Sequence, residues 1–326
     1  MHDDKAIVYA VGIGNSRRQI TLQAREILGA ADVVAGHYGF IEMVREFIRP
    51  QAKVIDDREA RKRSGTFVRY QHNRVSAVVA EALKGQTVAV VSGGDAGIWG
   101  MAGVLLEAQQ AYRGAFRVEV VPGVPSLVTI AARLGAPLQN GFTVISIGDE
   151  DTPFAVIEQR LRGAALGGGA IVLHKLILEN SQYPEYYPPD RYPELYPPVE
   201  KTRFRLQRTF DILKERVLPE CPMAIVTDAC DQTSRFSVAM KGLGADDHRE
   251  RIVVTAFREF LERAESFRFF TTVIIGDATT RRYGDVLFTP QWNYQWTYEK
   301  DMMNDIADLH YLKDQAEFFQ PGGDQP

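Results

Sequence analysis

Residues 92–103 combine five glycines with one carboxylate, in a pattern suited to holding a small ligand. The stretch reads SGGDAGIWGMAG and follows the apolar run at 87–91. Glycines let a bound molecule approach the backbone closely, although each is ~0.5–1 kcal/mol less favourable than alanine in a regular element. Asp95 can accept a hydrogen bond from a ribose hydroxyl or an ammonium group, and it can equally cap the next helix. The stretch predicts a ligand loop at the carboxyl end of a strand, where open α/β sheets bind ligands.

Two further turns have the same position relative to an apolar run. The run at 6–11 leads into GIG at 12–14, and the run at 118–121 leads into PGVPS at 122–126. Arg17 stands where a GxGxxG fingerprint needs its last glycine, so a Rossmann dinucleotide site is not indicated. A plain strand–helix turn explains GIG as well as a ligand loop does. Ser126 is placed to cap the helix that follows it.

The elements around these turns alternate between strands and helices. The three apolar runs are short and rich in Val and Ile, as buried parallel strands are. Helical patterns follow at 21–30, 70–84, 103–110 and 126–134. A second series contains strands at 143–147, 170–173, 223–227 and 271–276, with helices at 153–166, 204–218 and 253–264. This alternation predicts the α/β class with mainly parallel sheets.

Length and composition suggest three segments. A chain of 326 residues is long enough for two domains. We place an N-terminal α/β domain at 1–139, a C-terminal α/β domain at 140–290 and an aromatic, helical extension at 291–326. The segment 183–198 interleaves Tyr with Pro and is expected to be a long surface loop, because Pro lacks a backbone donor.

Charge and composition exclude several classes of function. The net charge of -4 argues against general nucleic-acid binding. The N-terminus has no signal-peptide pattern, and no apolar run is long enough to span a membrane. We therefore expect a cytoplasmic protein. The six histidines include no i, i+4 pair and the two cysteines form no CxxC motif, so no metal site is predicted.

Taken in order and spacing, these motifs resemble the tetrapyrrole (corrin/porphyrin) methylase family, and within it most the precorrin-3B C(17)-methyltransferase branch. The resemblance rests on GIG, on SGGDAGIWGMAG, and on VEVVPGVPS with ARLGAPL further on. The stretches ISIGD with TPF at 145–154 and TTVIIGDATTR at 271–281 add to it. It covers roughly residues 6–290, and the 92–103 stretch is its most specific part.

The resemblance implies two α/β domains with S-adenosylmethionine in the cleft between them, and a homodimer. Carried over residue by residue, it places cofactor contacts at Gly12, Gly14, Gly93, Gly94, Asp95, Gly97, Ile98, Ser126, Leu173, Thr227, Ala229, Thr272 and Val273. Methyl transfer from a sulfonium is an in-line displacement that needs alignment and a dry cavity. A carbon acceptor can also need a base, for which His37, His174 and Asp149 are the candidates, with a structural role open for each.

The chain departs from the family on the side of the acceptor. The relatives' FYNPxSxxR stretch is replaced by LHKL at 173–176. Early corrinoids carry many carboxylates, which Arg binds in a bidentate manner. We predict substrate contacts at Arg61, Arg63, Arg69 and Arg203, although these basic clusters can also be solvated faces.

Two alternatives remain open at this stage. One is a methyltransferase of the same fold that acts on another acceptor, such as a peptide. The other is a descendant that only binds and does not catalyse, against which the intact glycine stretch argues.

Overall fold

The computed structural model describes residues 5–56, 67–149, 152–178, 190, 193, 198–229, 250–268 and 270–290, with only the backbone of 67–72. The chain forms two compact units. Unit 1 contains the described residues of 1–129, with 190, 193, 229 and 250. Unit 2 contains the described residues of 130–178, 198–228 and 251–290.

Unit 1 is built on a parallel sheet of five strands with the order β3-β2-β4-β1-β5. The strands are β1 (Ile7–Gly12), β2 (Val33–Gly36), β3 (Lys53–Asp56), β4 (Val88–Ser92) and β5 (Arg117–Val121). All five residues of β4 are buried, as expected for a central strand covered on both faces. Strands β2 and β3 are only four residues long and are not among the strands predicted from the sequence.

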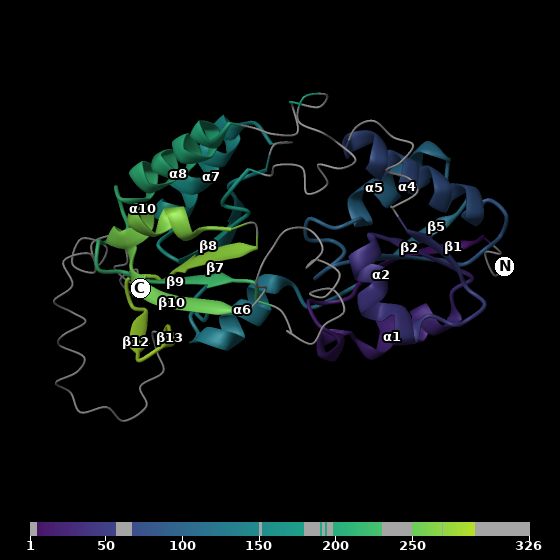
Figure 1. Ribbon diagram of the computed structural model, residues 1–326, viewed down its shortest axis with the longest axis horizontal. Helices are drawn as coiled ribbons and strands as arrows, with labels where there is room; N and C mark the ends of the chain where they lie inside the picture. Colours follow the sequence, from purple (N-terminus) through teal and green to yellow (C-terminus); the bar gives the residue numbers. More distant parts are fainter. Residues whose placement is uncertain are drawn as a thin grey trace, which may run out of the picture. The chain divides into compact units, whose positions relative to one another are not determined.

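Helices cover both faces of this sheet (Figure 1). They are α1 (Leu22–Ala30), α2 (Tyr38–Val44), α4 (Phe67–Ala82) and α5 (Ala102–Ala111). Residues of α1 and α2 share one hydrophobic cluster with the strands, and residues of α4 and α5 share another. The N-cap of α1 is Thr21, whose hydroxyl accepts a hydrogen bond from the Ala24 amide at 3.1 Å.

Unit 2 contains a mixed sheet with the order β10-β9-β11-β8-β7. Its strands are β7 (Phe142–Ser146), β8 (Ala170–His174), β9 (Pro222–Thr227), β10 (Arg251–Ala256) and β11 (Thr271–Ile275). Only β7 and β8 pair in parallel, and the other three pairings are antiparallel. The prediction of mainly parallel strands is therefore wrong for this sheet. An apolar run shows that a strand is buried but does not show its direction.

Helices α7 (Phe154–Gly167), α8 (Val199–Leu213) and α10 (Phe260–Arg263) pack on one face of this sheet (Figure 1). Helix α6 (Ser126–Leu134) begins in unit 1 and ends in unit 2. A small sheet joins β6 (Gly135–Ala136), β12 (Arg281–Tyr283) and β13 (Val286–Phe288).

Two helix predictions in unit 2 need correction. Helix α8 begins at Val199, earlier than the predicted residue 204, with Pro198 as its N-cap residue. The predicted helix at 253–264 begins as strand β10, which pairs with β9, and only α10 and short 3-10 turns are helical there. The β-branched residues Val253, Val254 and Thr255 favour the strand.

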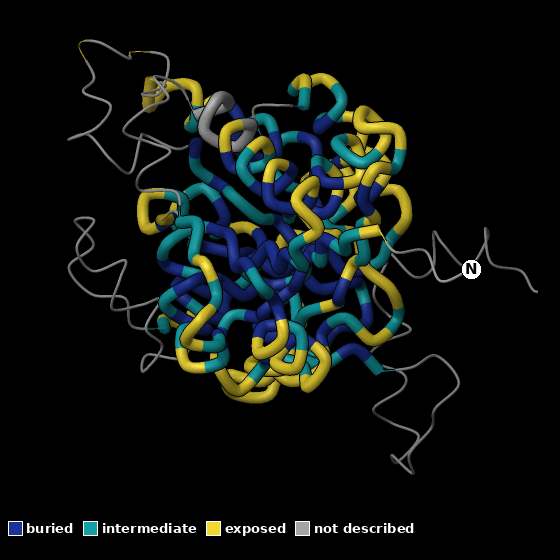
Figure 2. Tube along the Cα trace, turned by 90° about the vertical axis from the view of Figure 1, so that its right-hand side faces the viewer, coloured by how far each residue is buried: buried dark blue, intermediate teal, exposed yellow. Residues whose placement is uncertain are grey.

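Buried positions lie towards the inside of the fold and exposed ones towards its outside (Figure 2). Strands β4, β8, β9 and β11 are buried over most of their length. No helix in the described ranges is long and apolar enough to cross a membrane. The division at residue 139 and a separate extension at 291–326 remain proposals. The extension and the Tyr/Pro segment lie outside the described residues, apart from Asp190, Pro193 and Pro198.

Candidate functional site

Two glycine loops join backbone to backbone at the carboxyl edge of the unit 1 sheet. The Gly14 amide donates to the Gly94 carbonyl at 3.0 Å, and the Gly94 amide donates to the Gly14 carbonyl at 2.9 Å. The Ile13 amide also donates to the Ser92 carbonyl at 3.0 Å. The loop after β1 and the loop after β4 are therefore joined by an antiparallel bridge just beyond the parallel strands.

Asp95 connects the β4 loop to the loop after β5. Its Oδ2 accepts a hydrogen bond from the Gly123 amide at 2.9 Å, and its Oδ1 accepts one from the Gly97 amide at 2.7 Å. Asp95 does not cap helix α5, because the N-cap residue of that helix is Met101. The carboxylate thus fixes the positions of two loops, and each of its oxygens keeps capacity for another donor.

The glycines in these loops make room for one another. A Cβ on Gly123 would lie 2.1 Å from the Gly94 carbonyl oxygen, and a Cβ on Gly12 would lie 2.6 Å from the Gly123 amide nitrogen. Gly94 also has a positive φ of 68°. Loop-to-loop packing, which the sequence pattern did not reveal, therefore requires glycine at positions 12 and 123. Gly123 lies in the predicted PGVPS turn but is not among the site residues predicted from the sequence.

One part of the β4 loop faces solvent. Gly97 is exposed, Ile98 has 45% of its surface exposed and Trp99 has 60% exposed. A Cβ on Gly97 would meet only Asp95 Oδ1, at 3.3 Å. Ser126 is the first residue of α6, and its amide nitrogen lies 3.8 Å from the position of a Cβ on Gly94. The eight cofactor residues predicted in unit 1 therefore lie in the adjoining loops or, for Gly12 and Ser126, directly next to them.

His37 follows β2 and contacts the same edge through Phe40. It is the N-cap residue of α2, and its Nδ1 accepts a hydrogen bond from the Gly39 amide at 3.1 Å. A neutral His37 therefore carries its proton on Nε2. The Phe40 ring lies 5.4 Å from the His37 ring between centroids, and its Cε1 lies 2.6 Å from where a Cβ on Gly93 would be. The position of His37 is thus fixed against the β4 loop.

The predicted residues of unit 2 gather at one edge of its sheet. His174 ends β8 and Thr227 ends β9, while Thr272 lies near the start of the antiparallel strand β11. His174 Nδ1 and Thr272 Oγ1 are 2.8 Å apart, and the hydroxyls of Thr227 and Thr271 are 2.9 Å apart. We call this the threonine–histidine edge.

Three other predicted cofactor residues lie at or next to this edge. The side chains of Leu173 and Val273 are fully buried in the unit 2 core, so only their backbones are available for a contact. Ala229 is the last described residue after β9 and is half-buried.

Burial lowers the pKa of His174 to about 4, well below its ordinary value. The imidazole is therefore neutral at neutral pH and exchanges a hydrogen bond with Thr272. A group with so low a pKa is a weak proton acceptor, which favours a positioning role over that of a general base.

We expect His174 to make folding stability depend on pH. Its folded pKa lies below its unfolded pKa, so the unfolded chain takes up the proton first and stability is lost as pH falls from about 6.5 towards 4. The loss is about 2 kcal/mol at pH 5 and approaches about 3 kcal/mol below pH 4. Denaturant unfolding of wild type and His174→Gln at pH 7.5 and pH 5 measures it. A variant with the same pH dependence as wild type would contradict the assignment.

Asp149 lies in the loop after β7, which a buried arginine anchors. Thr152 Oγ1 donates to Asp149 Oδ2 at 2.6 Å. Arg205 of α8 is 6% exposed and donates from Nη1 to the carbonyls of Ile147 at 2.8 Å and Asp149 at 3.1 Å. Its guanidinium lies 4.9 Å from the Phe154 ring centroid. Both the backbone and the side chain of Asp149 are thus held in place.

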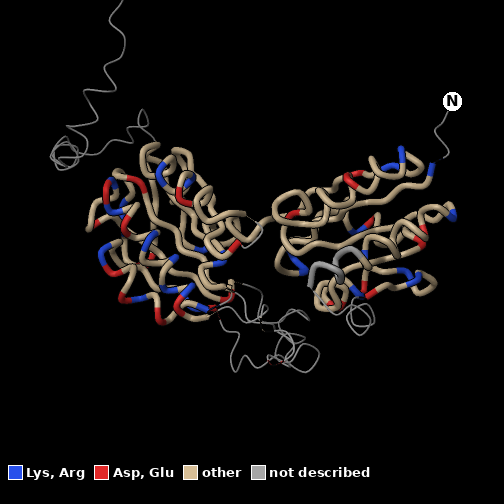
Figure 3. Tube along the Cα trace, turned by 90° about the horizontal axis from the view of Figure 1, so that it is seen from above, with Lys and Arg blue, Asp and Glu red and all other residues tan. Residues whose placement is uncertain are grey.

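The predicted basic clusters differ in their surroundings. Arg61 and Arg63 lie outside the described residues, and Arg69 is described only as backbone within α4. Arg203 is exposed on α8, whereas Arg208 pairs with Glu158 at 2.7 Å. Lys and Arg lie interspersed with Asp and Glu in both units (Figure 3). The basic residues of α8 therefore do not form a single cationic face.

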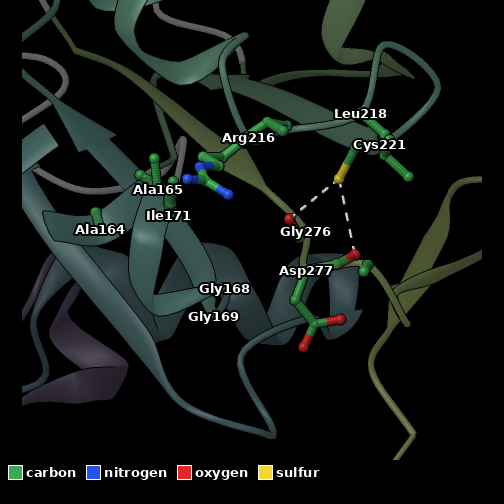
Figure 4. A pocket seen from close by; sticks show the side chains of 12 residues that line it. Ala164, Ala165, Gly168, Gly169, Ile171, Arg216, Leu218, Cys221, Gly276 and Asp277 are labelled. Atoms are coloured by element: carbon green, nitrogen blue, oxygen red, sulfur yellow. Dashed lines mark hydrogen bonds between the residues drawn. The ribbon is translucent and has the colours of Figure 1, made fainter. Parts of the chain in front are cut away.

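A small pocket lies at the opposite edge of the unit 2 sheet (Figure 4). None of the predicted site residues lines it. Within it, the Cys221 thiol donates to the Gly276 carbonyl at 3.1 Å, and burial together with the charge of Asp277 raises the pKa of this thiol to about 12. Cys221 is therefore an unreactive thiol at neutral pH.

Comparison with known proteins identifies the family. The model of the tetrapyrrole (corrin/porphyrin) methylases matches residues 7–239, which include the glycine loops and, from the threonine–histidine edge, His174 and Thr227. The chain belongs to this family. The three loops at the carboxyl edge of unit 1 all lie within the matched residues.

Individual tetrapyrrole methylases are similar over most of the chain. A cobalt-factor III methyltransferase of Priestia megaterium is 28% identical over 90% of the chain, which spans only 46% of that protein. A probable cobalt-factor III C(17)-methyltransferase of Salmonella typhimurium is 28% identical over 86% of the chain and 97% of that protein. A precorrin-3B C(17)-methyltransferase of a Sinorhizobium species is 34% identical over 52% of the chain and 64% of that protein.

Solved tetrapyrrole methylase structures share the fold. The methyltransferase CobJ matches with a TM-score of 0.63 at 24% identity, over 88% of this chain and all of that one. A uroporphyrin-III C-methyl transferase of Thermus thermophilus, complexed with S-adenyl homocysteine, matches with a TM-score of 0.54 at 20% identity, over 83% of this chain and 97% of that one.

Proposed function

We propose that the protein is an S-adenosylmethionine-dependent methyltransferase that methylates a ring carbon of a corrin-pathway tetrapyrrole. The observation that carries this proposal is the meeting of three loops at the carboxyl edge of the unit 1 sheet, within the segment that the family model matches. The names of the Salmonella and Sinorhizobium relatives support a C(17)-methyltransferase acting on cobalt-factor III or precorrin-3B.

The residues of unit 1 suit a cofactor of this kind. The end of β1 and the loops that would surround the cofactor contain Gly12, Gly14, Gly93 and Gly94. Asp95 fixes the position of the β4 loop against the loop after β5. The exposed backbone at Gly97 admits close approach, while Ile98 offers an apolar surface for the nucleoside, and Ser126 adds a polar group. S-adenosylmethionine supplies, when bound, a methyl group already activated by a sulfonium. We assign Thr227, Thr272 and the backbones of Leu173, Ala229 and Val273 as further cofactor contacts.

The chain's remaining task is to orient the acceptor and to accept a proton. Asp149 is our candidate for the proton acceptor, because its loop is anchored by Arg205 and Thr152. His174 orients through Thr272, and His37 supports the β4 loop through Phe40. We assign recognition of acceptor carboxylates to Arg203, together with Arg61, Arg63 and Arg69.

The assembly and location of the protein complete the proposal. We propose a homodimer, as the resemblance to the family implies, and a cytoplasmic location. Light scattering measures the mass in solution, and a mass equal to that of one chain would contradict the dimer.

The acceptor is tested by methyl transfer. We expect the protein to transfer a methyl group from S-adenosylmethionine to cobalt-factor III or precorrin-3B, which mass spectrometry detects as one added methylene. An unrelated peptide incubated in parallel should stay unmodified. Absence of methylation of both tetrapyrroles would overturn the assignment of the acceptor, and methylation of the peptide would favour the alternative acceptor class.

A further inference from the structure

Lys175 adopts a backbone conformation that side-chain-bearing residues rarely take. Its φ is +49°, directly after the last residue of β8. Residues in this left-handed conformation are usually Gly, Asn or Asp. Gly has no Cβ to approach the backbone too closely, and the short side chains of Asn and Asp can form local hydrogen bonds that offset the strain, which a longer side chain does not. Strained residues of this kind cluster at functional sites. Lys175 belongs to the LHKL segment at 173–176, which begins within β8 and includes His174 of the threonine–histidine edge.

The loop after β7 clamps this conformation. The Gly148 amide donates to the Lys175 carbonyl at 2.6 Å, and a Cβ on Gly148 would lie 2.5 Å from the same oxygen. Gly148 immediately precedes Asp149, whose carbonyl Arg205 holds. The backbone of Lys175 is therefore fixed by the same loop that carries the candidate proton acceptor.

The ammonium group of Lys175 makes no hydrogen bond or ion pair with any residue in the described ranges. The residue is nevertheless half-buried. The carboxylate of Asp149 accepts a hydrogen bond from Thr152 and not from Lys175. Asp228, which follows Thr227, is buried. A partly desolvated cation attracts an anion more strongly than a solvated one does, because the local dielectric constant is lower.

We propose that Lys175 binds a carboxylate of the tetrapyrrole acceptor and thereby determines which acceptor is used. This inference rests on the proposed function. A carboxylate at this edge has two sources, the side chains of the macrocycle and the amino-acid part of S-adenosylmethionine. The loop that clamps Lys175 also carries Asp149, the candidate proton acceptor, and this favours the macrocycle as the source.

The test compares three variants in steady-state methylation of cobalt-factor III. Lys175→Asn removes the charge and suits the left-handed backbone, so the fold is retained. Lys175→Arg keeps the charge. Arg113→Asn is the matched control, because Arg113 also combines a cationic side chain with a positive φ of 53°, in the exposed turn after α5. Calorimetry with S-adenosylhomocysteine and thermal melting are run on each protein.

We expect Lys175→Asn to raise the KM for cobalt-factor III about five- to tenfold and to reduce its dependence on salt. Its affinity for S-adenosylhomocysteine and its melting temperature should not fall. Lys175→Arg should have a KM for cobalt-factor III close to that of wild type, and Arg113→Asn should have the same KM as wild type. An unchanged KM in Lys175→Asn, or a loss of S-adenosylhomocysteine affinity instead, would overturn the inference about Lys175 alone. If wild-type protein neither binds nor methylates cobalt-factor III, the proposed function is overturned together with the inference about Lys175.

Discussion

Gly123→Ala is expected to destabilise unit 1 by about 3 kcal/mol and to abolish binding of S-adenosylhomocysteine. The added Cβ would lie 2.1 Å from the Gly94 carbonyl oxygen and 2.6 Å from the Gly12 carbonyl carbon. Both contacts are with backbone, so no side chain can rotate away, and the loops must separate. Their separation would also break the hydrogen bond between the Gly123 amide and Asp95.

The loss of stability should appear as a fall in melting temperature of roughly 6–12 °C for a unit of this size. Gly103→Ala is the control, because Gly103 is exposed in α5 and a Cβ there would meet nothing within 4 Å. That change should leave binding intact and raise stability by ~0.5–1 kcal/mol. Equal melting temperatures for Gly123→Ala and wild type would show that the loops do not pack as described.

The architecture of unit 1 could largely be predicted from the sequence. Buried parallel strands are short runs of Val and Ile, and their carboxyl ends share one edge of the sheet. Three such runs followed by glycine turns therefore place Gly12, Gly94 and Ser126 near one another. Helix α6 occupies 126–134 as expected, because the apolar periodicity and the proline before Ser126 agree.

The direction of the strands in unit 2 could not be predicted in this way. Strand β11 is buried along its whole length, and such a run looks the same whichever way it points. Residues 253–264 mix apolar spacings that suit a strand and a helix, and pairing with β9 decides for the strand over Arg251–Ala256. Tertiary contacts thus overrode the local pattern.

The contacts within the candidate site depend on strand register, which the sequence does not show. His174 and Thr272 are 98 residues apart and meet because β11 is antiparallel to β8, with Val273 opposite Leu173. The resemblance to the family named both residues but not their hydrogen bond. The loop-spacing role of Gly12 and Gly123 likewise became visible only when the three loops were placed together.

Ile98→Asp is expected to weaken binding of S-adenosylhomocysteine at least tenfold. Ile98 is 45% exposed on the loop that Asp95 fixes, so the change leaves the core untouched and alters stability by no more than about 0.5 kcal/mol. A bound nucleoside at this loop would desolvate the new carboxylate without offering it a partner, which opposes binding. Leu106→Asp is the matched control, because Leu106 has the same 45% exposure on α5 of the same unit.

Calorimetric titration of wild type, Ile98→Asp and Leu106→Asp with S-adenosylhomocysteine tests most directly whether the cofactor binds at the three loops of unit 1. We expect binding to wild type, equal affinity in Leu106→Asp and at least a tenfold loss in Ile98→Asp, with all three proteins folded. Failure of folded wild type to bind, or equal affinity in Ile98→Asp and wild type, would show that the cofactor does not bind at these loops.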